Sequence, residues 1–138
     1  MATLPMIFAF MVLAVTASVV VTGLTMSQNF AIQGNYRSLQ ARLFAQAGAK
    51  DALLRVVRDK NYSCAMSGCY AIDFAPAGCA NGNDCAKVSV SAGVGSDSDP
   101  KVIVSEGLLD GFVRKIQVDV FYDPQLNGQI ARAVWKEI

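Results

Sequence analysis

The stretch that decides the fold is residues 5–26, which read PMIFAFMVLAVTASVVVTGLTM. Small or hydroxylated residues interrupt it, and it contains no charged side chain. A helix of about 20 such residues is roughly 30 Å long, enough to cross the hydrocarbon core of a bilayer. Pro5 suits the first turn of a helix, because the N–H that proline lacks would have no partner there. The stretch therefore predicts an apolar N-terminal helix that can span a membrane.

Two other interpretations of this stretch are less favoured. A buried helix in a soluble core is one, but a domain of 138 residues can hardly enclose a helix that is apolar on all sides. A cleaved secretory signal is the other. It fits poorly, because no Lys or Arg precedes the apolar run and the run is too long.

The helical pattern continues beyond the apolar run in an amphipathic form. Apolar residues recur at spacings of three, four and seven, which draws one stripe along a helix: Leu39, Leu43, Ala47, Leu54 and Val57. Lys50 interrupts this stripe. We expect a first domain at residues 1–60, a single helix whose membrane or filament-core part is 1–26 and whose amphipathic part is 27–60.

All four cysteines lie in the next predicted segment, residues 61–86: Cys64, Cys69, Cys79 and Cys85. Their spacing, C-x4-C-x9-C-x5-C, lacks the C-x2-C pairs typical of zinc sites, so two disulfides are favoured over a metal knuckle. Four cysteines allow three connectivities, and the sequence does not choose among them. Because disulfides persist in oxidising compartments, we expect this segment to lie outside the cytoplasm.

From residue 87 the apolar period changes to two. Residues 87–91 and 101–105 predict short strands, 112–122 a long half-buried strand, and 130–137 a final strand. Residues 87–138 thus predict an antiparallel meander of about four strands, with one face free to pack on the amphipathic half of the helix. The expected fold class is α+β, a long N-terminal helix on a small antiparallel sheet.

The order of charges along the chain bears on its orientation in a membrane. No Lys or Arg precedes the apolar run, whereas Arg37 and Arg42 follow it. The positive-inside rule would place these arginines in the cytoplasm, although the cysteines favour the opposite side. Both observations agree if a short basic leader preceded Met1 and has been removed, which makes Met1 a processed N-terminus.

Composition excludes several classes of function. The chain has no histidine, which excludes His-based catalysis and imidazole zinc sites. Its net charge of +1 gives no sign of a nucleic-acid platform. Catalytic and nucleotide-binding motifs are absent from the sequence, so we expect no enzyme and no cofactor. Asp97 and Asp99 flank a serine in a predicted loop, which suggests a calcium site, but two carboxylates without an EF-hand pattern favour a solvated turn.

Charge also divides along the chain. Residues 1–60 carry six basic and two acidic side chains, a sum of +4, and residues 61–138 carry six basic and nine acidic, a sum of −3. Solvated faces on a small domain are the favoured explanation. The alternative is contact between basic and acidic parts of neighbouring subunits in a stack.

An apolar helix that continues into an amphipathic half, then a disulfide-stapled loop and an antiparallel meander, resembles a type IV pilin. The motif evidence lies mostly in residues 1–24. The start, MATLP, is similar to the processed N-terminus of that family, and Thr3-Leu4 resembles its Thr-Leu pair. Two features depart from the family. Pro5 replaces its acidic residue at mature position five, and the cysteines follow the helix instead of closing a C-terminal loop.

The resemblance implies partners and roles for particular residues. A prepilin peptidase would remove the leader, Met1 would be methylated, and pilus machinery would act at the inner (cytoplasmic) membrane before assembly. In the filament, Ala14 and Ser18 have the small-xxx-small spacing that allows close helix approach. Gly23 lies where helices of the family tend to lose regular structure, and Pro5 belongs to the same filament-core helix. The family's filaments serve adhesion, DNA uptake or motility.

These observations predict a structural subunit, a pilin, of an extracellular filament built from copies of this chain. Apolar helices that leave lipid must find another dry environment, and a head-to-tail contact that does not close yields a helical filament. One alternative is a minor pilin or a secretion-system pseudopilin. Another is a single-pass, membrane-anchored extracytoplasmic binding domain that does not polymerise.

Overall fold

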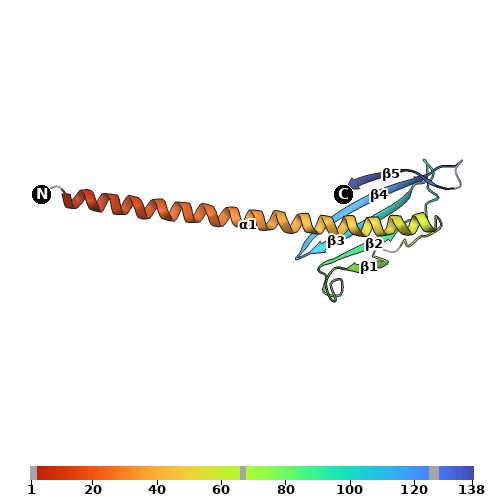
Figure 1. Cartoon of the computed structure of the whole chain (residues 1–138), viewed down its shortest axis with the longest axis horizontal. Coiled ribbons are helices and arrows are strands. Elements are labelled where there is room, and N and C mark those ends of the chain that lie inside the picture. Colours follow the sequence, from red (N-terminus) through yellow and green to blue (C-terminus); the bar gives the residue numbers. More distant parts are fainter. Residues whose placement is uncertain (1–2, 66–67, 125–127) are drawn as a thin grey trace. The chain divides into compact units, whose positions relative to one another are not determined.

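The computed structural model describes residues 3–65, 68–124 and 128–138, with the helical backbone alone at residues 3–5, 21–25 and 27. Helix α1 (Thr3–Arg58) comes first, and five strands follow it (Figure 1): β1 (Tyr70–Asp73), β2 (Cys85–Val90), β3 (Lys101–Leu109), β4 (Phe112–Tyr122) and β5 (Ile130–Glu137). The predicted α+β class is confirmed. The chain divides into two compact units, Met1–Tyr36 and Arg37–Ile138.

The five strands form one antiparallel sheet in the order β1-β2-β3-β4-β5, so each strand pairs with its neighbour in sequence. Four of them match the predicted meander. The fifth strand, β1, lies within residues 61–86, which were predicted as a cysteine-stapled loop, and it pairs with β2. At only four residues, β1 is too short to give a clear alternation in the sequence.

A tight turn of two residues connects strands β3 and β4. Asp110 and Gly111 have positive φ values of 47° and 81°, as a two-residue hairpin requires. Tight pairing on both sides of this turn extends β3 to Leu109, beyond the predicted end at Ser105. Burial alternates strictly along β3, so every second side chain faces the helix.

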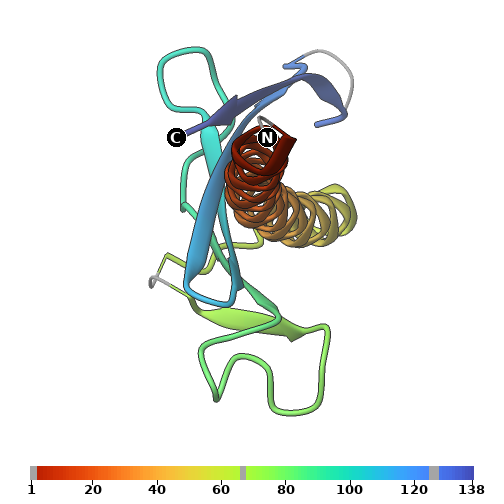
Figure 2. The same cartoon turned by 90° about the vertical axis from the view of Figure 1, so that its left-hand side faces the viewer.

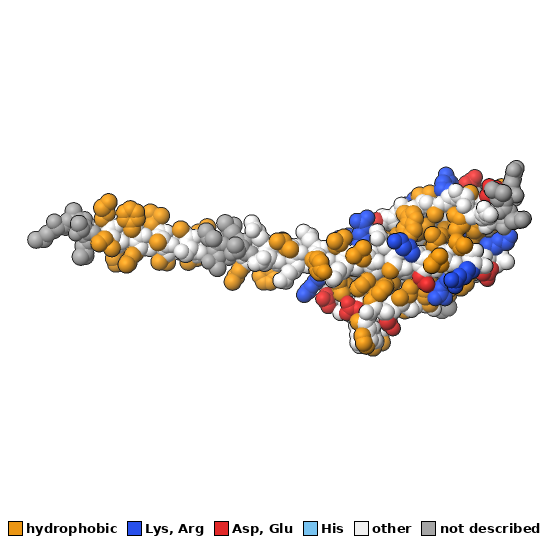
Figure 3. Space-filling model, viewed as in Figure 1, with side chains coloured by type: hydrophobic (Ala, Val, Ile, Leu, Met, Phe, Trp, Pro, Cys, Tyr) orange, Lys and Arg blue, Asp and Glu red, His pale blue; other side chains and the backbone are white. Residues whose placement is uncertain are grey.

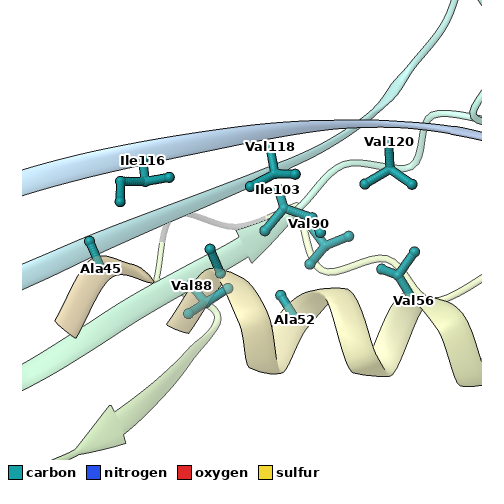
Figure 4. Close-up of a cluster of buried hydrophobic side chains, with 10 residues drawn as sticks. Ala45, Ala52, Val56, Val88, Val90, Ile103, Ile116, Val118 and Val120 are labelled. Atoms are coloured by element: carbon teal, nitrogen blue, oxygen red, sulfur yellow. The ribbon is translucent and has the colours of Figure 1, made fainter. Parts of the chain in front are cut away.

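The core lies between one face of this sheet and the part of α1 that belongs to the second unit (Figure 2). On the helix its members are mostly small and fully buried: Ala41, Ala45, Ala49, Ala52 and Val56, the alanine face. On the sheet they are branched (Figure 4): Val88, Val90, Ile103, Ile116, Val118 and Val120. Small residues on one side and branched residues on the other let the helix approach the strands closely.

The predicted apolar stripe is therefore not the face that packs on the sheet. Four of its members remain 51–61% exposed: Leu39, Leu43, Leu54 and Val57, the leucine face. The reason is the short distance between helix and sheet. A Cβ on Gly107 would overlap the carbonyl oxygen of Ala41, and one on Gly48 would lie 2.9 Å from side-chain carbons of Ala86 and Val88. Leucines do not fit into that gap, whereas alanines do.

Candidate assembly surfaces

The apolar segment, defined here as residues 6–20 of α1, exposes hydrophobic side chains on every side. Ten of its residues are large hydrophobics with exposed fractions between 53% and 71%. Residues 6–8 and 10–13 are consecutive, and consecutive helix positions point in directions about 100° apart. The apolar surface therefore surrounds the helix. Figure 3 shows the hydrophobic side chains on the face of this segment that is turned toward the viewer.

The few polar groups of the apolar segment are satisfied within it. The hydroxyl of Thr16 donates to the carbonyl oxygen of Leu13 at 3.0 Å, and that of Ser18 to the carbonyl oxygen of Ala14 at 2.8 Å. Ala14 and Ser18, the predicted small-xxx-small pair, are both exposed one turn apart. Because these hydroxyls have acceptors in their own helix, the segment can enter a dry environment without unpaired donors.

Other predicted residues of the N-terminal helix fall outside the description. Met1, the predicted methylation site, lies outside the described residues, as do the side chains of Pro5 and Gly23. The sequence predicted a membrane-crossing helix at residues 5–26. In the part of α1 that the structure describes, no stretch is both long enough and apolar enough for such a crossing.

The leucine face is the second exposed apolar surface. At 100° per residue, its centre lies roughly 145° around the helix from the centre of the alanine face. Lys50 is exposed within the stripe, and no ion pair joins it to another described residue. The second unit thus turns an apolar surface with one cation at its middle toward solvent.

Several basic residues of α1 are balanced by acids of the same chain. Arg37 lies 3.6 Å from Asp110, and Arg42 lies 3.3 Å from Glu137. All four side chains are 40–49% exposed, so each pair contributes at most about 1 kcal/mol. Contact between a basic part of one subunit and an acidic part of the next, the alternative that the charge division left open, is therefore not favoured at these residues.

The cysteines form two local disulfides, Cys64–Cys69 and Cys79–Cys85. The prediction of two disulfides is confirmed, and the structure selects one of the three connectivities. Asp73, Cys79 and Cys85 are grouped closely enough to suggest a metal site. Because both sulfurs are bonded to each other, only one carboxylate remains as a ligand.

An aromatic contact that the sequence did not reveal holds this cysteine loop on the helix. The ring of Phe74 stacks on that of Phe44 in α1, with centroids 4.3 Å apart and planes 10° from parallel. Phe74 lies in an irregular segment, where no periodicity indicates the direction of a side chain. An aromatic residue in a loop of otherwise small side chains was the available signal.

The carboxylates of Asp97 and Asp99 make contacts within a turn, in agreement with the favoured interpretation of these residues as a solvated turn. A carboxylate oxygen of Asp99 accepts from the main-chain N–H of Val94 at 3.1 Å, and Asp97 lies 3.5 Å from Arg132. The guanidinium of Arg132 also lies 4.2 Å from the centre of the Phe121 ring. Asp97, Phe121 and Arg132 line an open cleft, and the charged groups of Asp97 and Arg132 are thus engaged in contacts within the chain.

Protein-family models, curated proteins and solved structures gave no match to this chain. The described residues offer two exposed apolar surfaces, the apolar segment and the leucine face. Their polar clusters are turns, ion pairs and disulfides.

Proposed function

We propose that this chain is a structural subunit of an extracellular helical filament, and more specifically a pilin of the type IV kind. The observation that carries the proposal is the apolar segment, whose ten large hydrophobic side chains are more than half exposed around the whole helix. Complete burial of such a side chain contributes about 1.5–3 kcal/mol. Covering the segment would therefore stabilise an assembly by on the order of 10 kcal/mol or more.

In the proposed filament, the apolar segment of one copy packs against the apolar segments of other copies. The segment carries no charge, and its Thr16 and Ser18 hydroxyls bond to its own backbone. Helices of this kind pack without burying an unpaired polar group. A repeated contact that does not close into a ring extends into a helical filament.

The location is also part of the proposal. Two disulfides fit an oxidising compartment, so the second unit belongs outside the cytoplasm. The hydropathy of residues 5–26 in the sequence supports storage in the cytoplasmic membrane before assembly. Processing by a prepilin peptidase, methylation of Met1 and export by pilus machinery follow from the resemblance alone.

One observation favours a second candidate function. Pro5 stands where the pilin family has an acidic residue, and no Asp or Glu precedes Asp51. This departure favours a minor pilin or a secretion-system pseudopilin, which would carry the same fold in smaller amounts. A membrane-anchored binding domain would share the apolar helix but would not polymerise.

The test is the intact mass of proteins sheared from the cell surface, before and after reduction. We expect an abundant species with the mass of residues 1–138 plus one methyl group, which gains four hydrogens on reduction. Trace amounts in the filament fraction would favour the minor subunit. A methyl-free monomer that only detergent extracts from the membrane would overturn the filament proposal.

A matched pair of variants connects filament formation to the apolar segment. Val12→Lys places a charge within the segment, whereas Val113→Lys places one on β4 of the second unit. Both valines are exposed, at 53% and 45%, so neither change disrupts the core. We expect electron microscopy to show filaments for Val113→Lys and none for Val12→Lys. Filaments from both variants would contradict the proposed packing.

A further inference from the structure

The leucine face stays exposed although the same helix already packs on the sheet through its alanine face. Leu39, Leu43, Leu54 and Val57 are each more than half exposed. Exposed apolar side chains that gather on one face of a small domain mark an interaction site more often than apolar side chains scattered singly. The question is which molecule covers it.

We propose that the leucine face of one copy binds the apolar segment, residues 6–20, of a second copy. This inference rests on the proposed filament function and adds the subunit surface that receives the apolar helix. Each chain then carries one of each surface. A contact between two different surfaces is heterologous, so it propagates from copy to copy instead of ending at a dimer.

The two surfaces agree in length and chemistry. Residues 6–20 extend about 22 Å along a helix, and residues 39–57 extend about 28 Å. The apolar segment has no charged residue, and the hydroxyls of Thr16 and Ser18 donate to its own carbonyl oxygens. A stripe of leucines can cover it without leaving a polar group unpaired.

Lys50 argues against the simplest alternative, in which two leucine faces pack on each other. Lys50 lies near the middle of the stripe, so an antiparallel pair of faces would bring the two ammonium groups together. Like charges at a contact are unfavourable. Against an uncharged helix, the aliphatic part of Lys50 packs while its ammonium reaches the edge of the contact.

Photo-crosslinking identifies the occupant directly. The full chain carries benzoylphenylalanine in place of Leu43, and isotopically labelled and unlabelled copies are assembled together. Trypsin releases residues 43–50 and residues 1–37 as separate peptides, because no Lys or Arg lies between Met1 and Arg37. We expect hybrid labelled products that join these two peptides. Benzoylphenylalanine at Val113, also exposed, is the matched control and should not give them.

Other products would overturn the inference. Crosslinks between two copies of residues 43–50 would show that leucine faces pack on each other. Crosslinks to the sheet of a second copy, or to detergent or lipid alone in intact filaments, would name a different occupant. If the unmodified chain forms no filaments at all, the proposed function fails first; filaments with crosslinks elsewhere refute this inference alone.

A double variant measures the contribution of the leucine face to assembly. The change is Leu43→Gln with Leu54→Gln, and the control is Val94→Gln with Val113→Gln, because all four residues are exposed. Both proteins should unfold at the wild-type urea concentration, since neither change reaches the core. We expect the protein concentration needed for filaments to rise about tenfold or more for the leucine variant alone, which is about 1.4 kcal/mol. Equal concentrations for variant and control would overturn the inference.

The variant Lys50→Glu distinguishes an uncharged partner surface from an acidic one. The apolar segment carries no charge, so reversing this charge should change the assembly concentration no more than about twofold. Loss of assembly on Lys50→Glu would instead indicate an acidic partner surface and would refute the inference.

Discussion

The side-chain nitrogen of Lys101 donates a hydrogen bond of 2.8 Å to the main-chain carbonyl of Tyr62. It donates a second, of 2.7 Å, to the carbonyl of Lys60, although Lys101 is only 2% exposed. Burial lowers the pKa of this ammonium, and the nearby Asp59 carboxylate opposes that shift. Lys101 thus ties the chain that leaves helix α1 to the first residue of β3.

Lys101→Met should destabilise the second unit. The substitution keeps the length of the side chain but leaves two carbonyl groups without this donor, and an unsatisfied buried group costs about 1–3 kcal/mol. Urea unfolding of the full chain in mild detergent measures the change. The control is Lys115→Met, whose half-exposed pair with Glu106 at 3.5 Å should contribute no more than about 1 kcal/mol. Equal losses for both variants would contradict the role of Lys101.

Gly107→Ala should separate the sheet from the helix. The new Cβ would overlap the carbonyl oxygen of Ala41 and come within 2.5 Å of the main-chain nitrogen of Ala45. Such overpacking costs about 1–3 kcal/mol, because helix and strand must both shift. Gly34→Ala is the control: its Cβ would meet nothing within 4 Å, and alanine favours a helix. If Gly107→Ala unfolded at the wild-type urea concentration, the space between helix and strand would be large enough for a methyl group.

Asp119 should make the stability of the second unit sensitive to acid. Its carboxylate lies 2.6 Å from Lys136 Nζ and accepts from Gln117 at 2.6 Å. The hydrogen bond from Lys136 is the main cause that lowers the pKa of Asp119. As the pH falls, the Asp119 carboxylate of the unfolded chain is therefore protonated at a higher pH than that of the folded chain. The stabilisation is complete above about pH 4 and is lost as the pH falls toward the lowered pKa.

Unfolding in urea between pH 2 and pH 6 tests this dependence. Asp119→Asn should remove part of the loss of stability at low pH and lower the stability at pH 6. Asp97→Asn is the matched control, since that side chain is 93% exposed. An unchanged acid profile for Asp119→Asn would show that the carboxylate is not responsible.

The disulfide pairing should be visible in a proteolytic map without reduction. Trypsin cuts after Lys60 and Lys87, so all four cysteines remain in one peptide. Chymotrypsin then cuts after Tyr70 and Phe74, between the two disulfides. We expect the two halves to separate before any reductant is added. Halves that stay joined until reduction would show one of the other two connectivities.

The sequence predicted most of the fold because local patterns govern most of it. The end of the helix near residue 60 and four of the five strands follow from a change of apolar period. The four-residue strand β1 lacked such a pattern and depends on its pairing with β2. The presence of disulfides followed from the spacing of cysteines, but their pairing depends on where the chain turns.

The candidate surfaces divide in the same way. The apolar segment was evident in the sequence, because no charge occurs before Arg37. The leucine face was predicted as an apolar stripe, but it is not the side of the helix that packs on the sheet. Large hydrophobic residues dominate the apolar periodicity of a sequence. Close packing of a helix on a sheet instead requires small residues, such as Ala45 and Ala52.

The sequence by itself determined that a long helix precedes an antiparallel sheet, since hydropathy and its period act over neighbouring residues. Only the tertiary structure decided which side of that helix meets the sheet. That choice depends on the space between α1 and β3, where Gly107 lies against the backbone of Ala41 and excludes bulky side chains. The leucines on the opposite side remain exposed for that reason.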